Sequence, residues 1–118
     1  MENVTNKERG NMKTLETKCR ERMTEDVRKL INGEKESCQR WYTCNTDLIE
    51  GIYIAYLSES IMTTEGNPMS FKEMVTMAYN VLGTKQPANP RAYVYRAQTR
   101  KGTRQYSLIR RCMNMHYY

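Results

Sequence analysis

Apolar residues recur every three or four positions in the first third of the chain. They are Met12, Leu15, Cys19, Met23, Val27 and Leu30. This spacing puts them in one narrow stripe along the face of an α-helix, which Asn32 and Gly33 then end. A stripe so narrow predicts a helical arm that docks against the rest of the domain or pairs with its copy in a second chain.

A second periodic segment indicates the central helix of the fold. Thr46 is placed to cap it, and Asp47 and Glu50 lie in the first turn, where acids interact favourably with the helix dipole. Trp41, just before this helix, is expected to plug the edge of a small core. The apolar residues cover much of the helix circumference. They are Leu48, Ile49, Ile52, Tyr53, Ala55, Tyr56 and Leu57.

The stretch Thr63–Met69 breaks the pattern with Gly, Asn and Pro, and a third helix follows it. Ser70 and Glu73 have the spacing of a capping box, which marks a helix N-terminus. Gly83 is a C-terminal stop. One apolar face lies between these signals, made of Phe71, Met74, Val75, Ala78 and Leu82.

A further helix is predicted to begin at Asn89 and Pro90, because Asn is common at the N-cap and Pro in the first turn. Residues 92–101 remain open to two interpretations, because Ala92–Tyr95 also suit a strand. A helix ending at Gly102 is the favoured interpretation. It puts Val94 and Ala97 on one side and Tyr93, Arg96 and Arg100 on another.

These segments predict an all-α protein. We expect a small helical bundle with a helix-turn-helix or winged-helix-like DNA-binding core and an N-terminal helical arm. The arm spans 1–33, a linker spans 34–45 and the basic helix-turn-helix-like domain spans 46–118. Thr103 is placed to cap a last helix with Leu108, Ile109 and Cys112. One core is expected to hold Leu48, Ile52, Tyr56, Phe71, Val75, Ala78, Leu82 and Val94.

The net charge of +6 is unevenly distributed along the chain. All 13 Asp and Glu residues lie at or before Glu73, whereas eight of the 19 Lys and Arg residues follow it. A basic, acid-free end is the footprint of a protein that binds a polyanion. A solvated basic tail is the simpler alternative.

The sequence gives little support to a metal site, an enzyme active site or a membrane span. Cys19, Cys38, Cys44 and Cys112 lack the close pairs of a zinc site, so mostly buried, reduced thiols are expected. The one histidine, His116, offers no Cys-His or Ser-His-Asp arrangement, and the carboxylates mostly suit helix surfaces. We therefore predict no enzyme, metal, cofactor or small-molecule substrate. With no apolar run near the roughly 20 residues of a membrane span and no secretory signal, we expect a cytoplasmic protein without membrane contact.

The basic helix suits double-stranded DNA. The major groove admits one α-helix, and arginine pairs bidentately with guanine or with phosphate oxygens. The predicted contacts are Arg91, Tyr93, Arg96, Arg100, Lys101 and Arg104, the last two on phosphates. A homodimer is a further expectation, because it would set two such helices on half-sites one turn apart. RNA or an acidic protein partner remains an alternative.

Four parts of the sequence resemble a known family. They are Trp41, TDLIEGIYIAY (Thr46–Tyr56), FKEMVTMAYNVLG (Phe71–Gly83) and NPRAYVYRAQTRKGTR (Asn89–Arg104). In these parts the chain resembles the C-terminal domain of RteC-type proteins, regulators carried by Bacteroides conjugative transposons. The resemblance implies an all-helical, winged-helix-like DNA-binding domain in a transcription regulator of element excision or transfer. It differs from the family in having one predicted helix where the family has a longer N-terminal helical domain.

Overall fold

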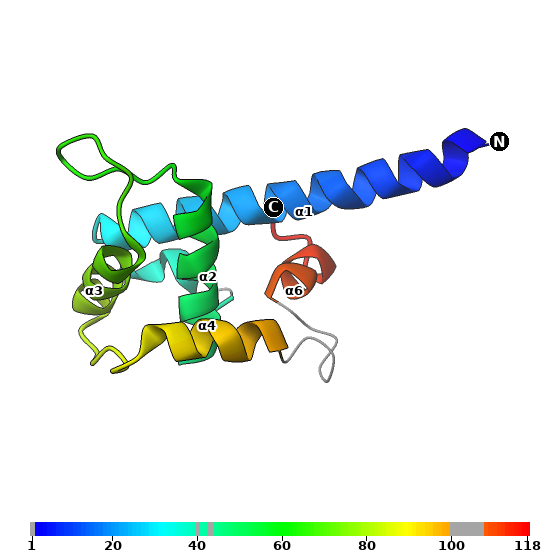
Figure 1. Cartoon of the computed structure of the whole chain (residues 1–118). Coiled ribbons are helices and arrows are strands. Elements are labelled where there is room, and N and C mark those ends of the chain that lie inside the picture. The colour runs from blue at the N-terminus through cyan, green and yellow to red at the C-terminus, as the bar shows by residue number, and fades with distance from the viewer. Residues whose placement is uncertain (1, 40, 43, 100–107) are drawn as a thin grey trace.

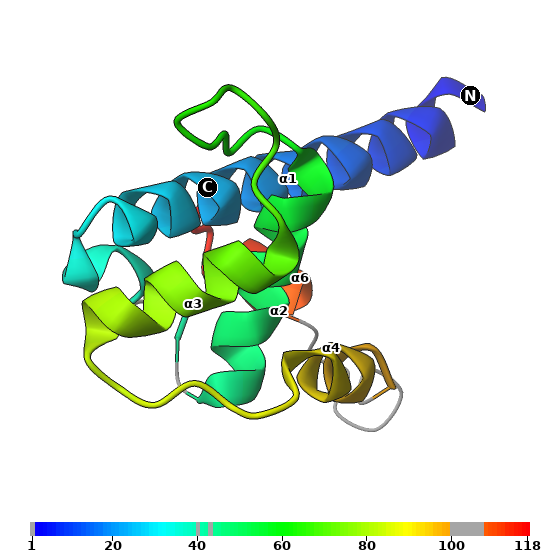
Figure 2. The ribbon, with the colours of Figure 1, turned by 60° about the vertical axis from the view of Figure 1, so that its left-hand side comes forward.

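The computed structural model describes residues 2–39, 41–42, 44–99 and 108–118, with side chains from residue 14 onward. The elements are α1 (Glu2–Ile31), the 3-10 helix η1 (Lys35–Cys38), α2 (Asn45–Ser58), α3 (Phe71–Leu82), α4 (Pro90–Thr99) and α6 (Leu108–Asn114). Within these ranges the chain is a compact globule of five α-helices without a β-strand, which confirms the all-α prediction. In Figures 1 and 2, α2 stands between α1 on one side and α4 on the other.

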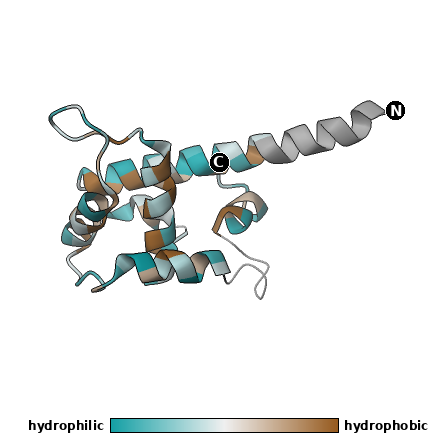
Figure 3. Ribbon diagram, in the orientation of Figure 1, coloured by the Kyte–Doolittle hydropathy of each residue, from teal (hydrophilic) through white to brown (hydrophobic). Residues whose placement is uncertain are grey.

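The apolar stripe of α1 packs against the body of the fold. Its side chains at Cys19, Met23, Val27 and Leu30 are fully buried, in contact with the same core that α2 and α3 enter. The predicted docking of the arm is therefore confirmed for this part of the stripe. Figure 3 shows hydrophobic residues where α1, α2 and α3 meet.

The helix α1 begins ten residues earlier than the apolar stripe that predicted it. It starts at Glu2, and its N-terminal part extends beyond the rest of the fold (Figure 1). The extra residues include several good helix formers and no proline, so the backbone continues as a helix without an apolar stripe to mark it.

Trp41 fills the edge of the core, as predicted. Its indole is 1% exposed and lies over Gly51 of α2, where any Cβ atom would collide with the ring. The predicted cap at Thr46 is wrong, because α2 begins at Asn45 and its N-cap is Cys44, which makes no side-chain cap. The first turn is held from outside instead, by a 2.7 Å hydrogen bond that Tyr79 of α3 donates to Asn45 Oδ1.

Asp26 is an acid inside the fold, an exception to the expectation of surface carboxylates. It is 2% exposed, and its Oδ2 accepts hydrogen bonds from Trp41 Nε1 at 3.0 Å and from the Tyr117 hydroxyl at 2.6 Å. Arg22 Nε lies 3.5 Å from Oδ1 and supplies the opposite charge. Burial and the hydrogen bond to Asp26 raise the pKa of Tyr117. The carboxylate thus ties α1 to the segment before α2 and to the C-terminal residues.

Both ends of α3 form as the sequence predicts. Ser70 Oγ accepts from Glu73 N, the Glu73 carboxylate accepts from Ser70 N, and Gly83 closes the helix at φ 73°. A left-handed residue at this position favours glycine, which has no Cβ.

The predicted core is largely confirmed. Tyr56 and Leu82 are half-buried at its edge, and the other six predicted members are buried. These six are Leu48, Ile52, Phe71, Val75, Ala78 and Val94.

A second buried acid fixes α6 on the start of α2. Asp47 Oδ1 lies 2.5 Å from Arg111 Nη2, and this acid is almost fully buried. The predicted apolar residues Leu108, Ile109 and Cys112 are buried beside it, which confirms the last helix. The expected end at Gly102 and cap at Thr103 lie outside the described residues. Of the helices in the described ranges, none is long and apolar enough to cross a membrane.

Cys38 gives the fold an expected sensitivity to alkaline pH. Burial raises the pKa of its thiol from 9.0 to about 12. Between these values the unfolded chain releases the proton while the folded chain keeps it, so stability present below pH 9 is lost as the pH rises toward 12. We expect Cys38→Ala to show a smaller drop in Tm than wild type between about pH 8 and about pH 10.

The matched control for this experiment is Cys44→Ala, which removes an exposed thiol. It should retain the wild-type drop in Tm. Burial also raises the pKa values of Tyr79 and Cys112, so part of the alkaline loss should persist in Cys38→Ala. An unchanged drop in Cys38→Ala would contradict the burial of this thiol.

Candidate nucleic-acid interface

The basic segment forms a helix in the part that the structure describes. Pro90 is the first residue of α4, and Ala92 N donates to Asn89 O at 3.2 Å in the opening turn. Residues 92–99 are therefore helical, and the strand alternative is wrong for them. Residues 100 and 101 lie outside the described ranges.

The helix α4 packs on α2 through one side only. Val94 and Ala97 are buried, as predicted, and they set the inward direction of the helix. At about 100° per residue, Ala92, Tyr95 and Thr99 point the opposite way. Of these, Tyr95 and Thr99 are exposed to solvent, and Ala92 is half-buried.

Two arginines lie on the two flanks of this outward side, and each guanidinium rests on an aromatic ring. Arg96 Cζ is 4.7 Å from the ring centroid of Tyr93, and Arg91 Cζ is 5.0 Å from that of Phe71. Phe71 is 4% exposed and meets Tyr53 edge to face, so the platform under Arg91 is part of the core. Such stacking holds an arginine in place while its nitrogen atoms stay available to a ligand.

Both arginines keep their charge uncompensated. Within the described part of the chain, neither Arg91 nor Arg96 forms an ion pair, and both are exposed. The acids of α2 that face the C-terminal region are engaged elsewhere: Asp47 pairs with Arg111, and Glu50 Oε2 accepts from Leu108 N at 3.4 Å. The exposed side of α4 is therefore positively charged.

The structure brings together three of the six predicted contact residues. Arg91, Tyr93 and Arg96 all lie on α4, and Tyr93 is half-buried beneath Arg96. The other three lie outside the described residues. They are Arg100, Lys101 and Arg104.

The sequence interpretation missed Tyr95. This side chain is 69% exposed, and on the helix it lies between the directions of Arg91 and Arg96. The signal was present in the spacing, because burying Val94 and Ala97 turns position 95 toward solvent. Phe71 was assigned to the core alone, and its ring has the second role of supporting Arg91.

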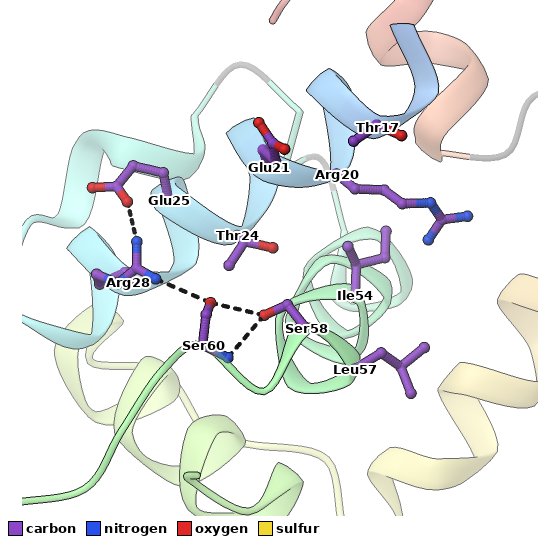
Figure 4. A pocket seen from close by; sticks show the side chains of 10 residues that line it. All are labelled: Thr17, Arg20, Glu21, Thr24, Glu25, Arg28, Ile54, Leu57, Ser58 and Ser60. Carbon is purple, nitrogen blue, oxygen red and sulfur yellow. Dashed lines mark hydrogen bonds and ion pairs between the residues drawn. The ribbon is translucent and has the colours of Figure 1, made fainter. Parts of the chain in front are cut away.

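A pocket of about 480 Å³ lies between α1 and the C-terminal part of α2, and none of its lining residues belongs to α4 (Figure 4). Both of its arginines already engage acids of α1. Arg28 pairs with Glu25 and donates to Ser60 Oγ at 3.1 Å, and Arg20 pairs with Glu16 at 3.0 Å. The pocket therefore offers no uncompensated cation comparable to those of α4.

No group of His, Cys, Asp and Glu side chains in the described ranges is arranged to hold a metal ion. No protein-family model, curated protein or solved structure matches the chain. The candidate site therefore rests on the geometry and charge of α4.

Proposed function

We propose that this protein is a non-enzymatic transcription regulator that binds double-stranded DNA through α4. The observation that carries the proposal is the pair of exposed, unpaired arginines on the two flanks of one helix, each supported by an aromatic ring. A helix of this width enters the major groove of B-DNA, whose walls are lined by phosphates. Arg91 and Arg96 would contact those walls, and Tyr93 would hold Arg96 in position.

The order of the helices along the chain supports the same proposal. The helices α2, α3 and α4 follow one another, α3 and α4 both pack on α2, and residues 83–89 connect α3 to α4. This is the order of a helix-turn-helix unit whose last helix meets DNA. The usual turn has about three or four residues and the connection here has seven, so the proposed unit is a long-turn, winged-helix-like variant whose β-wing is not seen among the described residues.

The resemblance to RteC-type proteins adds a biological context to the proposal. It suggests a regulator of genes for excision or transfer of a mobile element, acting in the cytoplasm. A homodimer would allow two copies of α4 to bind adjacent half-sites, at a separation of one helical turn of DNA.

Arg96→Ala is expected to weaken binding to all duplex sequences about equally and to lower the salt slope by about one, as loss of a phosphate contact does. Arg20→Ala is the matched control, because Arg20 is an exposed arginine of α1, a helix that lies across α2 from α4 in Figure 1. Fluorescence anisotropy with labelled duplexes at several salt concentrations measures both variants. Equal affinity of Arg96→Ala and wild type would remove Arg96 from the interface.

An acidic protein partner is the second candidate, favoured by the same exposed arginines and by Tyr95, since Tyr and Arg are enriched at protein interfaces. Such a partner should bind with a defined stoichiometry while duplex DNA is not retained. The anisotropy experiment separates the two candidates.

A further inference from the structure

The outward side of α4 carries one large side chain between the two arginines, and the sequence interpretation did not use it. Tyr95 is 69% exposed, the most exposed of the large apolar and aromatic side chains in the described part of the chain. Arg91 lies one turn before it on one flank, and Arg96 follows it on the other. An exposed aromatic ring thus lies between the two charged groups.

The neighbours of Tyr95 leave it free to project. Of the side chains three or four residues away, Ala92 and Thr99 are small, whereas Arg91 and Gln98 are long and lie together on one flank. Thr99 Oγ1 bonds to Arg96 O at 3.1 Å, so its hydroxyl is turned toward its own helix. A surface that approaches α4 from outside therefore meets the Tyr95 ring before it meets the backbone.

We propose that Tyr95 is the residue of α4 that enters the major groove and gives the protein its sequence preference. This inference rests on the proposed function. If Arg91 and Arg96 contact the groove walls, the side chain between them is directed at the floor, where base edges are exposed. An aromatic ring there packs against the C5-methyl group of thymine, which distinguishes thymine from cytosine.

The two arginines would then contact phosphates, and Tyr95 would contact base edges. Phosphate contacts fix the position of a protein on the duplex without reading sequence, whereas contacts to base edges discriminate between sequences. Removal of the Tyr95 ring should therefore change which sequences are preferred more than it changes affinity for duplex DNA in general.

The test is selection from a library of random duplexes with the full chain, followed by sequencing of the retained DNA. Wild type should enrich a motif that contains thymine at one position. Tyr95→Ala should still retain duplex DNA but lose the preference at that position by about fivefold or more. Tyr95→Phe keeps the ring and should enrich the wild-type motif.

Tyr118→Ala is the matched control, an exposed tyrosine at the C-terminus, which lies beside α1 and across the fold from α4 in Figures 1 and 2. It should select the wild-type motif. Circular dichroism of each variant verifies that the helices are retained, which is expected at a position as exposed as Tyr95.

The outcomes separate this inference from the proposed function. If wild type retains duplex DNA and Tyr95→Ala enriches an unchanged motif, Tyr95 does not read sequence and the proposed function stands. If wild type retains duplex DNA but enriches no motif, the inference about Tyr95 is also overturned and the proposed function stands. A wild-type chain that retains no duplex overturns both proposals and favours the acidic protein partner. Loss of the motif in Tyr95→Phe would overturn the ring contact and assign the reading to the hydroxyl.

Discussion

Trp41→Ala is expected to lower the free energy of unfolding by about 3–5 kcal/mol, as truncation of a buried tryptophan usually does. The indole packs on Gly51 of α2, and its Nε1 donates to Asp26 of α1. Its removal would leave a cavity between the two helices and take a hydrogen-bond donor from a buried carboxylate. Denaturant unfolding followed by circular dichroism measures the loss.

A second substitution tests whether this contact has the geometry described. A Cβ atom at position 51 would lie 2.6 Å from Trp41 Cζ3, so Gly51→Ala should destabilise wild type by about 1–3 kcal/mol through overpacking. In the Trp41→Ala background the ring is gone. There the same change should stabilise by up to about 1 kcal/mol, because alanine favours a helix more than glycine does.

Only a contact between Trp41 and position 51 predicts that Gly51→Ala destabilises the wild type but stabilises the Trp41→Ala variant. If Gly51→Ala destabilised both backgrounds equally, the two residues would not interact, and the position of Trp41 over α2 would be wrong.

Asp26→Ala is expected to lower the free energy of unfolding by about 2–5 kcal/mol, because it leaves two buried hydrogen-bond donors without their acceptor. The substitution leaves Trp41 Nε1 and the Tyr117 hydroxyl without their acceptor, and Arg22 without its nearest negative charge. The C-terminal residues should also loosen, since Tyr117 is bound to α1 through this carboxylate. Denaturant unfolding gives the free energy, and limited proteolysis reports on the C-terminus.

Glu16→Ala is the matched control, because it removes an acid of the same helix that pairs with Arg20 on the surface. Exposed pairs four residues apart contribute about 0.3–0.5 kcal/mol. Comparable destabilisation by Asp26→Ala and Glu16→Ala would show that Asp26 is not held in a buried network.

Local signals in the sequence were enough to predict most of the helices. Helix ends are marked by residues that satisfy unpaired backbone groups only a few positions away, so these signals can be recognised in the sequence alone. The examples here are Ser70 with Glu73, Gly83, and Asn89 with Pro90. The start of α2 was misplaced because the group that holds Asn45 is the Tyr79 hydroxyl, which comes from a different helix. No local pattern contains that information.

The buried acids could not be predicted for the same reason. Asp26 has the spacing of an ordinary polar helix residue, and its partner Tyr117 is 91 positions away. Asp47 lies in the first turn of α2, as predicted, but its burial and its ion pair with Arg111 of α6 could not be read from that position. Each acid is tolerated inside because distant residues supply donors and opposite charge.

The candidate site was predicted in its location but not in its arrangement. Charge distribution pointed to the segment after Pro90, and the pattern of Val94 and Ala97 predicted the buried side of α4. The positions of the rings required the packed structure. Tyr93 lies beneath Arg96, and Tyr95 holds the outward position between the arginines.

Binding of the wild-type chain to duplex DNA at different salt concentrations tests the central claim most directly. We expect retention at about 50 mM salt, with affinity falling steeply and linearly on a logarithmic scale toward about 200 mM as phosphate contacts release counterions. Arg91→Ala with Arg96→Ala should reduce the slope by about two, since each arginine would neutralise one phosphate. Absence of binding at about 50 mM salt, where phosphate contacts are strongest, would contradict a duplex-binding α4.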